Sequence, residues 1–209
     1  MEIIKDPGRI ERKSMSIIEE SLPDLKNFPP VEREIIKRVI HTTGDLACMS
    51  MVRISPWAVE SGLDAIRRGC SVLTDVNMLK TGLISARMDA FGVSAHCLIS
   101  DPEVIQESRK SGITRAMLAM KKGAALAHNG IVAVGNAPTA LFELCRMISE
   151  GEARPALVVG TPVGFVGAAE SKEMLMETGV HYITMPGTRG GSTIAASIVN
   201  ALLIQATGP

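Results

Sequence analysis

The sequence predicts an α/β fold: a doubly wound, flavodoxin-like domain with a mostly parallel, five-stranded sheet and helices on both faces. Two observations support this prediction. Short apolar runs rich in β-branched residues alternate with stretches of helical character along residues 71–205. The runs also lack the strict alternation of a half-exposed strand, which fits strands that are buried on both faces of a parallel sheet.

An additional helical segment, residues 1–70, precedes the first predicted strand. Ser55 is a helix N-cap followed by a proline, and Gly44 and Gly69 are stop signals for helices. We expect this segment to pack on the sheet as part of a single domain that spans residues 1–209. The helices expected in the segment cover residues 9–20, 31–43 and 56–68.

The remaining elements follow a regular order, in which each apolar run leads into a turn of glycine, asparagine or proline and then into a helix. This order is typical of strands joined by crossover helices. The predicted strands cover residues 71–74, 94–99, 131–134, 156–159 and 182–185. The predicted helices cover residues 77–84, 102–110, 114–126, 138–150, 168–178 and 192–205.

The composition argues against several classes of partner. Basic and acidic side chains both number 22, so no global electric field attracts nucleic acid or a membrane surface. No apolar stretch reaches about 18 residues, and no signal-peptide core is recognisable. The four cysteines are widely spaced without a C-x-x-C pair, which is typical of reduced thiols. These features predict a cytoplasmic protein that binds neither nucleic acid nor membranes and has no metal centre.

Glycine-rich loops follow the predicted strands at the edge where open parallel sheets bind their ligands. Residues 135–138, 160–165 and 186–192 each lead towards a helix N-terminus, where unpaired backbone N–H groups bind anions. Arg189 adds a fork-shaped donor for a carboxylate or a phosphate. None of the loops matches a Walker or dinucleotide-binding signature. The loops indicate an anion site, although glycines also serve simply to close tight turns.

His41 and Ser14 occupy unexpected positions on their predicted helices. His41 lies opposite the apolar stripe of the helix over residues 31–43, so it is either an acid–base group or a cation at a helix C-terminus. Ser14 points with the apolar stripe of its own helix, where its hydroxyl needs a backbone carbonyl or a ligand. The histidines expected to be structural are His96, His128 and His181.

Several short motifs occur in a distinctive order along residues 5–200. They are Asp6-Pro7-x2-Ile10-Glu11-x2-Ser14, Arg38-Val39-Ile40-His41-Thr42-Thr43-Gly44-Asp45, Thr74-Asp75-Val76-x-Met78-x3-Gly82, Thr114-Arg115, Val134-Gly135-Asn136-Ala137-Pro138-Thr139-Ala140-Leu141, Gly160-Thr161-Pro162-Val163-Gly164-Phe165, Glu170-Ser171-Lys172 and Gly187-Thr188-Arg189-Gly190-Gly191-Ser192. Each motif alone is modest, but their joint presence in this order is specific. In these motifs the chain resembles the precorrin-8X and cobalt-precorrin-8 methylmutase family of cobalamin biosynthesis.

The resemblance implies an isomerase that moves a methyl group from C11 to C12 of a tetrapyrrole, precorrin-8X or cobalt-precorrin-8, by a 1,5-sigmatropic shift. The product would be hydrogenobyrinic acid or cobyrinic acid. The family's catalytic histidine falls on His41, and substrate contacts fall on Ser14 and Arg115. The resemblance also implies a homodimer with the active site close to the subunit interface. The other substrate-binding positions that we expect are Thr42, Thr81, Gly82, Asn136, Gly187, Arg189, Gly190 and Gly191.

This reaction needs no cofactor, because the methyl group moves within one molecule and any cobalt is carried by the substrate. Two other functions also fit the residues. One is a phosphate- or nucleotide-handling enzyme on the same fold, against which the missing nucleotide signatures count. The other is a non-catalytic tetrapyrrole-binding protein, which would hold its ligand without changing it.

Overall fold

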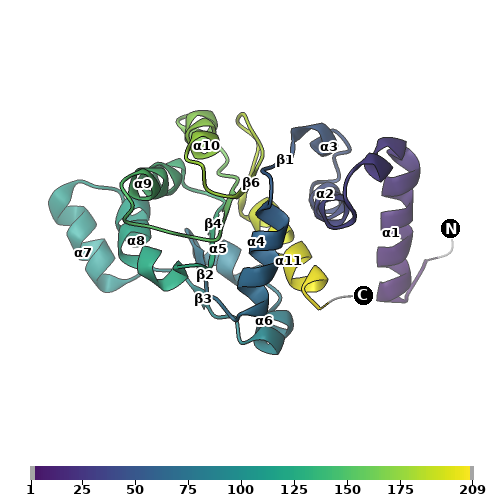
Figure 1. Cartoon of the computed structure of the whole chain (residues 1–209), viewed down its shortest axis with the longest axis horizontal. Helices are drawn as coiled ribbons and strands as arrows, with labels where there is room; N and C mark the ends of the chain where they lie inside the picture. Colours follow the sequence, from purple (N-terminus) through teal and green to yellow (C-terminus); the bar gives the residue numbers. More distant parts are fainter. Residues whose placement is uncertain (1–2, 208–209) are drawn as a thin grey trace.

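A six-stranded, mostly parallel sheet forms the middle of the structure, a computed structural model that describes residues 3–207 (Figure 1). Along the sheet the strand order is β1-β6-β5-β4-β2-β3, and among the described strands only β1 runs antiparallel to its neighbour. The strands are β1 (Arg53–Ile54), β2 (Val72–Thr74), β3 (Ala95–His96), β4 (Ile131–Val134), β5 (Leu157–Gly160) and β6 (Tyr182–Thr184).

The predicted α/β class and mostly parallel sheet are confirmed, but the expected number of five strands is wrong. The additional strand, β1, consists of Arg53 and Ile54, which pair with Thr184 and Ile183 of β6. Two residues are too few to show a periodicity, and their partners lie far along the chain. The five parallel strands, numbered along the chain, lie in the order 2-1-3-4-5, so the order reverses between β2 and β4. Doubly wound sheets bind ligands at such a reversal.

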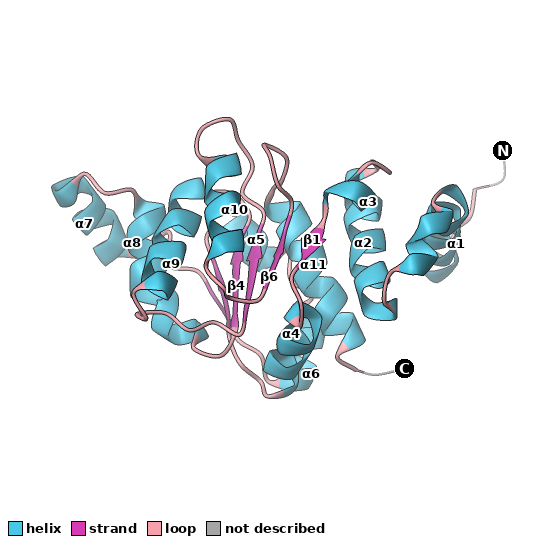
Figure 2. Cartoon of the chain, turned by 45° about the horizontal axis from the view of Figure 1, so that its top comes forward, coloured by secondary structure: helices cyan, strands magenta, loops and turns pink. Residues whose placement is uncertain are grey.

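Helices cover both faces of this sheet (Figure 2). Most lie where the sequence predicts them, but the helix predicted over 77–84 ends at residue 81, and the short helices over 48–51 and 85–91 were not predicted. They are α1 (Pro7–Ser21), α2 (Pro30–Thr43), α3 (Cys48–Met51), α4 (Ala58–Arg67), α5 (Asn77–Thr81), α6 (Ser85–Phe91), α7 (Pro102–Ser111), α8 (Arg115–Gly123), α9 (Pro138–Ser149), α10 (Ala168–Glu177) and α11 (Ser192–Gln205), with 3₁₀ turns at Pro23–Asn27 and Ala124–Ala127.

Alternate residues of the central strands divide between two apolar cores. In β4, Ile131 and Ala133 pack into the core shared with α2, α4 and α11, whereas Val132 and Val134 pack into the core shared with α8, α9 and α10. All four β4 side chains are buried, which explains why this strand reads as a continuous apolar run. Burial of a valine or isoleucine side chain contributes about 1.5–3 kcal/mol, so both faces stabilise the sheet.

The N-terminal segment forms an outer layer that reaches the sheet through the last helix. Most of α11 is buried, and it packs against α2, α4 and α5. Helix α2 lies on α11, and α1 in turn lies on α2, at one end of the molecule (Figure 1). Residues near the two ends of the chain are thus brought side by side. None of the helices within residues 3–207 is both long and apolar enough to cross a membrane.

Candidate active site

Ser14 and His41 meet across the interface between α1 and α2. Ser14 Oγ lies 2.8 Å from Nδ1 of His41, so the serine hydroxyl finds its partner in a side chain. His41 is in the last turn of α2, which ends at Gly44 in the left-handed conformation, and its side chain is exposed. The other ring nitrogen, Nε2, makes no hydrogen bond to the residues that the structure describes.

Charged side chains hold α1 in place on α2. The ammonium of Lys37 lies 2.6 Å from carboxylate oxygens of both Glu19 and Glu34, and Arg38 lies 2.5 Å from Glu11. Burial alone would lower the pKa of Lys37, but hydrogen bonds to the two carboxylates outweigh it and raise the pKa above its ordinary value. These pairs flank the hydrogen bond between Ser14 and His41, so the docking of α1 also sets the position of the serine hydroxyl.

Asp75 joins the ends of β2 and β4 at the reversal of the strand order. This buried carboxylate accepts hydrogen bonds from the backbone N–H groups of Gly135 (3.1 Å), Asn136 (2.8 Å) and Ala137 (2.8 Å). Burial raises the pKa of Asp75, and the three N–H donors oppose that shift. Asp75 therefore holds the loop after β4 from the interior of the protein, and Asn136 is exposed at the surface of this loop. Sequence reasoning missed this role, because a lone aspartate at a strand end has no local signature.

The two glycine-rich loops after β5 and β6 are tied to each other by backbone hydrogen bonds. Gly191 N–H donates to the carbonyl of Thr161 at 2.8 Å, and Gly164 N–H donates to that of Thr188 at 3.1 Å. A Cβ at Gly190 would lie 2.2 Å from the Thr161 carbonyl oxygen, which makes a side chain there impossible without moving the backbone. Glycine is thus required at position 190, because the backbones of the two loops approach each other closely there.

Lys172 on α10 supports the second loop from inside the protein. Its ammonium donates to the carbonyl of Arg189 at 2.8 Å, and the residue is fully buried. Burial lowers the pKa of Lys172 to about 8. Sequence reasoning placed this residue only within a family motif, because a lysine on a partly polar helix is normally solvated.

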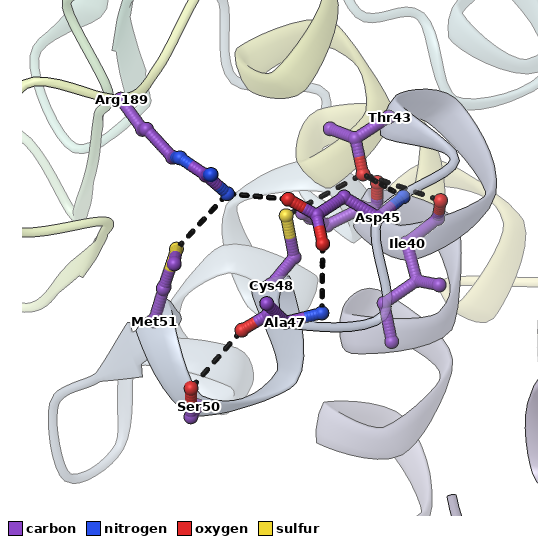
Figure 3. A network of polar contacts seen from close by, with 9 residues as sticks. Ile40, Thr43, Asp45, Ala47, Cys48, Ser50, Met51 and Arg189 are labelled. Atoms are coloured by element: carbon purple, nitrogen blue, oxygen red, sulfur yellow. Dashed lines mark hydrogen bonds and ion pairs between the residues drawn. The ribbon is translucent and has the colours of Figure 1, made fainter. Parts of the chain in front are cut away.

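The side chain of Arg189 links this loop to the end of α2 (Figure 3). It forms an ion pair with Asp45, the residue after the C-cap of α2, and its Nη1 lies 3.8 Å from the sulfur of Met51. Asp45 also accepts the N–H of Ala47 at 2.9 Å, and this bond, followed by Arg189, lowers the pKa of the Asp45 carboxyl. The predicted residue Arg189 is therefore brought to the segment that carries His41.

Three of the other predicted positions, Thr81, Gly82 and Arg115, lie on segments that make their polar contacts elsewhere in the described residues. Arg115 is the first residue of α8, whose N-cap Thr114 contacts Thr139 at the start of α9. The hydroxyl of Thr81 is already used within α5, and Gly82 accepts a hydrogen bond from α11. No hydrogen bond or ion pair among the described residues links these positions to His41. Thr42 follows His41, which contacts Ser14, and Gly187, Gly190 and Gly191 share the loop whose Arg189 pairs with Asp45. Asn136 follows Gly135, which packs closely against Gly191 and Ser192 of that loop.

Comparisons with known proteins cover almost the whole chain. The family described as precorrin-8X methylmutase matches residues 9–205. The chain is 40% identical to a cobalt-precorrin-8 methylmutase of Leptospira interrogans, over 98% of this chain and 96% of that one. It is 37% identical to a precorrin-8X methylmutase of Pseudomonas aeruginosa, over 98% and 99% of the two chains. The crystal structure of a precorrin-8X methylmutase from Thermus thermophilus matches with a TM-score of 0.86 and 38% identity, over 95% of this chain and 97% of that one.

Proposed function

The chain belongs to the precorrin-8X methylmutase family, and from this membership we propose how its site performs the methyl shift. The protein is an isomerase of cobalamin biosynthesis that acts on a tetrapyrrole. We propose that the methyl group moves from C11 to C12 in a 1,5-sigmatropic shift. The comparisons favour neither a nucleotide-handling enzyme nor a non-catalytic carrier.

The hydrogen bond between Ser14 and His41 is the observation that supports this mechanism. An imidazolium donates from both ring nitrogens. If His41 Nδ1–H donates to Ser14 Oγ, the ring orientation is fixed and Nε2–H is available to the substrate. Donation to a ring nitrogen beside the migrating methyl would withdraw electron density from the macrocycle and lower the barrier. General acid assistance of this kind supplies about 10²–10⁴-fold in rate.

The remaining site residues would hold the peripheral carboxylates of the substrate. Arg189 lies close to the segment that carries His41, and Gly187, Gly190 and Gly191 form the loop around it. Arg115 begins α8 and Asn136 precedes α9, and they would contact other parts of a wide macrocycle. A chain with no net charge attracts such a polyanion through local donors of this kind.

The reaction itself requires neither a methyl donor nor a redox agent, so we propose that the enzyme uses no cofactor. Cobalt, where present, enters and leaves with the substrate. Relatives with both names, cobalt-precorrin-8 methylmutase and precorrin-8X methylmutase, match this chain along nearly its full length. Comparing the affinity for the metal-free product with that for its cobalt form would show which substrate the site prefers.

We propose that the enzyme is a cytoplasmic homodimer. Ile10 and Ile17, two turns apart on α1, are 47% and 52% exposed, and they lie on the outermost helix of the molecule. An exposed apolar stripe on such a helix fits contact with a second copy. The four cysteines are free thiols, as expected in a reducing compartment. Light scattering coupled to size-exclusion chromatography would give the mass, and a monomer would exclude the dimer.

The first experiment measures the visible absorption spectrum of the protein mixed with hydrogenobyrinic acid and, separately, with its cobalt counterpart. We expect near-stoichiometric binding with a shifted spectrum. His41→Ala should lower turnover by about 10²–10⁴-fold, because the acid is lost, and should leave product affinity within a few-fold of wild type. His128→Ala, at an exposed histidine outside the site, is the matched control and should keep its turnover. Full turnover in His41→Ala, or no binding of either corrinoid, would overturn the proposal.

A further inference from the structure

Lys172 is a buried lysine whose ammonium has few partners, so its burial does not by itself stabilise the fold. Its ammonium has three donors, and among the described residues its only hydrogen-bond partner is the carbonyl of Arg189. No carboxylate of the described residues pairs with it, and its pKa is lowered by burial alone. A buried, unpaired ammonium destabilises a fold, whereas an apolar side chain of the same length would stabilise it.

A second polar group is buried beneath the same loop. Thr161, whose carbonyl accepts the N–H of Gly191, is completely buried, and its own hydroxyl finds no partner among the described residues. The loop over residues 187–191 therefore covers two polar side chains whose hydrogen-bonding capacity is incompletely used. Such groups are uncommon in protein interiors and require an explanation.

The single bond of Lys172 fixes the orientation of one peptide group. The peptide between Arg189 and Gly190 is trans, since the described chain has no cis peptide bond. In a trans peptide the C=O and N–H groups point in opposite directions. Because the Arg189 carbonyl points at the buried Lys172, the N–H of Gly190 points away from it. This N–H donates to no acceptor among the described residues, unlike that of Gly191.

We propose that Lys172 is a positioning residue, which turns the Arg189–Gly190 peptide so that the Gly190 N–H and the Arg189 guanidinium together bind one carboxylate of the substrate. This inference rests on the proposed function, and it adds a backbone donor and its buried support to that site. Arg189 would exchange its ion pair with Asp45 for the substrate carboxylate, while the peptide stays fixed. A backbone N–H beside an arginine fork is a geometry suited to carboxylates.

The test compares Lys172→Met with the same substitution at an exposed lysine, Lys122→Met on α8. Turnover and binding of hydrogenobyrinic acid are measured for both variants, together with their melting temperatures. In Lys172→Met we expect KM and the product Kd to rise about tenfold, equal to about 1.4 kcal/mol, with kcat nearly unchanged and the melting temperature not lowered. Lys122→Met should match wild type in KM and Kd.

An unchanged Kd in a folded Lys172→Met, or a fall in stability with no change in KM, would overturn the inference. If that variant does not fold, NMR of the wild-type protein decides instead. The amide of Gly190 should shift and gain protection from hydrogen exchange when hydrogenobyrinic acid is added, and an unaffected amide would refute the assignment. Failure of wild-type protein to bind either corrinoid would instead remove the proposed function, and this inference with it.

Discussion

Two ionisable side chains are buried at the same edge of the sheet, and their surroundings differ. Asp75, at the reversal between β2 and β4, accepts three backbone N–H groups. Lys172, beneath the loop after β6, donates to a single carbonyl. The charge of Asp75 is hydrogen-bonded by the loop that it supports, so this contact stabilises the fold. The charge of Lys172 has too few hydrogen-bond partners, which fits a residue that is retained for ligand binding at a cost to stability.

We expect the largest effect on stability from removing the charge of Asp75. Asp75→Ala would leave three N–H donors without acceptors, one of them on the buried Gly135, and should destabilise the protein by about 3–5 kcal/mol. Asp75→Asn keeps one oxygen and should cost less, about 1–3 kcal/mol. Urea unfolding followed by circular dichroism measures both values. A loss below about 1 kcal/mol in the alanine variant would show that Asp75 is not the support of this loop.

Removing the charge of Lys172 should instead raise the free energy of unfolding. Burial lowers the pKa of Lys172 from 10.5 to about 8, a shift that corresponds to about 3 kcal/mol. Lys172→Met should therefore be more stable than wild type at pH 7 by up to about 3 kcal/mol.

This gain should depend on pH. Below pH 8 the native lysine is charged and the full cost of burying it is present. Between about pH 8 and 10.5 the unfolded chain binds more protons than the native protein, so wild-type stability rises and the advantage of the variant shrinks. Unfolding curves at pH 7, 9 and 10.5 measure the difference, and a constant difference would contradict the burial of this charge.

The exposed hydrogen bond between Ser14 and His41 extends the comparison to the outer helices. Ser14→Ala removes the hydroxyl that contacts His41 Nδ1 and should lower the unfolding free energy by only about 0.5–1.5 kcal/mol. Turnover should fall by about tenfold or more, because the imidazole loses the bond that orients it. Ser16→Ala, which alters an exposed bond to Glu20 on the same helix, is the control. Equal turnover in the two variants would show that Ser14 does not position His41.

The smallest effect on stability is expected at the exposed ion pair of Asp45 and Arg189. Asp45→Asn should leave the melting temperature unchanged within error, because solvent screens this pair. It should lower KM for the corrinoid by a few-fold, since Arg189 no longer has to leave a carboxylate before it binds the substrate. A higher KM would instead show that Asp45 holds Arg189 in the productive position.

The parts of this structure that could be predicted from sequence are those governed by local patterns. The apolar run of β4 and the helix stop at Gly44 are both encoded within a few residues, and the structure shows both. His41 and Ser14 each depart from the pattern of their helix, and their contact accounts for both departures. Neither pattern predicts that the two side chains contact each other, because 27 positions separate them.

The missed features depend on long-range contacts. β1 becomes a strand only beside β6, and Asp75 acquires its role only where the loop after β4 meets β2. Lys172 has the sequence environment of a surface lysine, and only the packing of α10 beneath the loop after β6 buries it. Residues of this kind are recognised from structure, since their neighbours are distant in the chain.

The stacking of α2 on α11 has a consequence for the order of folding. The helix that carries His41 is synthesised before its partner, Ser192–Gln205, which lies far along the chain from it. Contacts so distant in the chain close late and slow the folding reaction. A nascent chain that has not yet released α11 from the ribosome would expose the apolar face of α2. His41 therefore reaches its native surroundings only after α11 has been synthesised, and a product terminated before α11 would carry the histidine without the helix on which α2 packs.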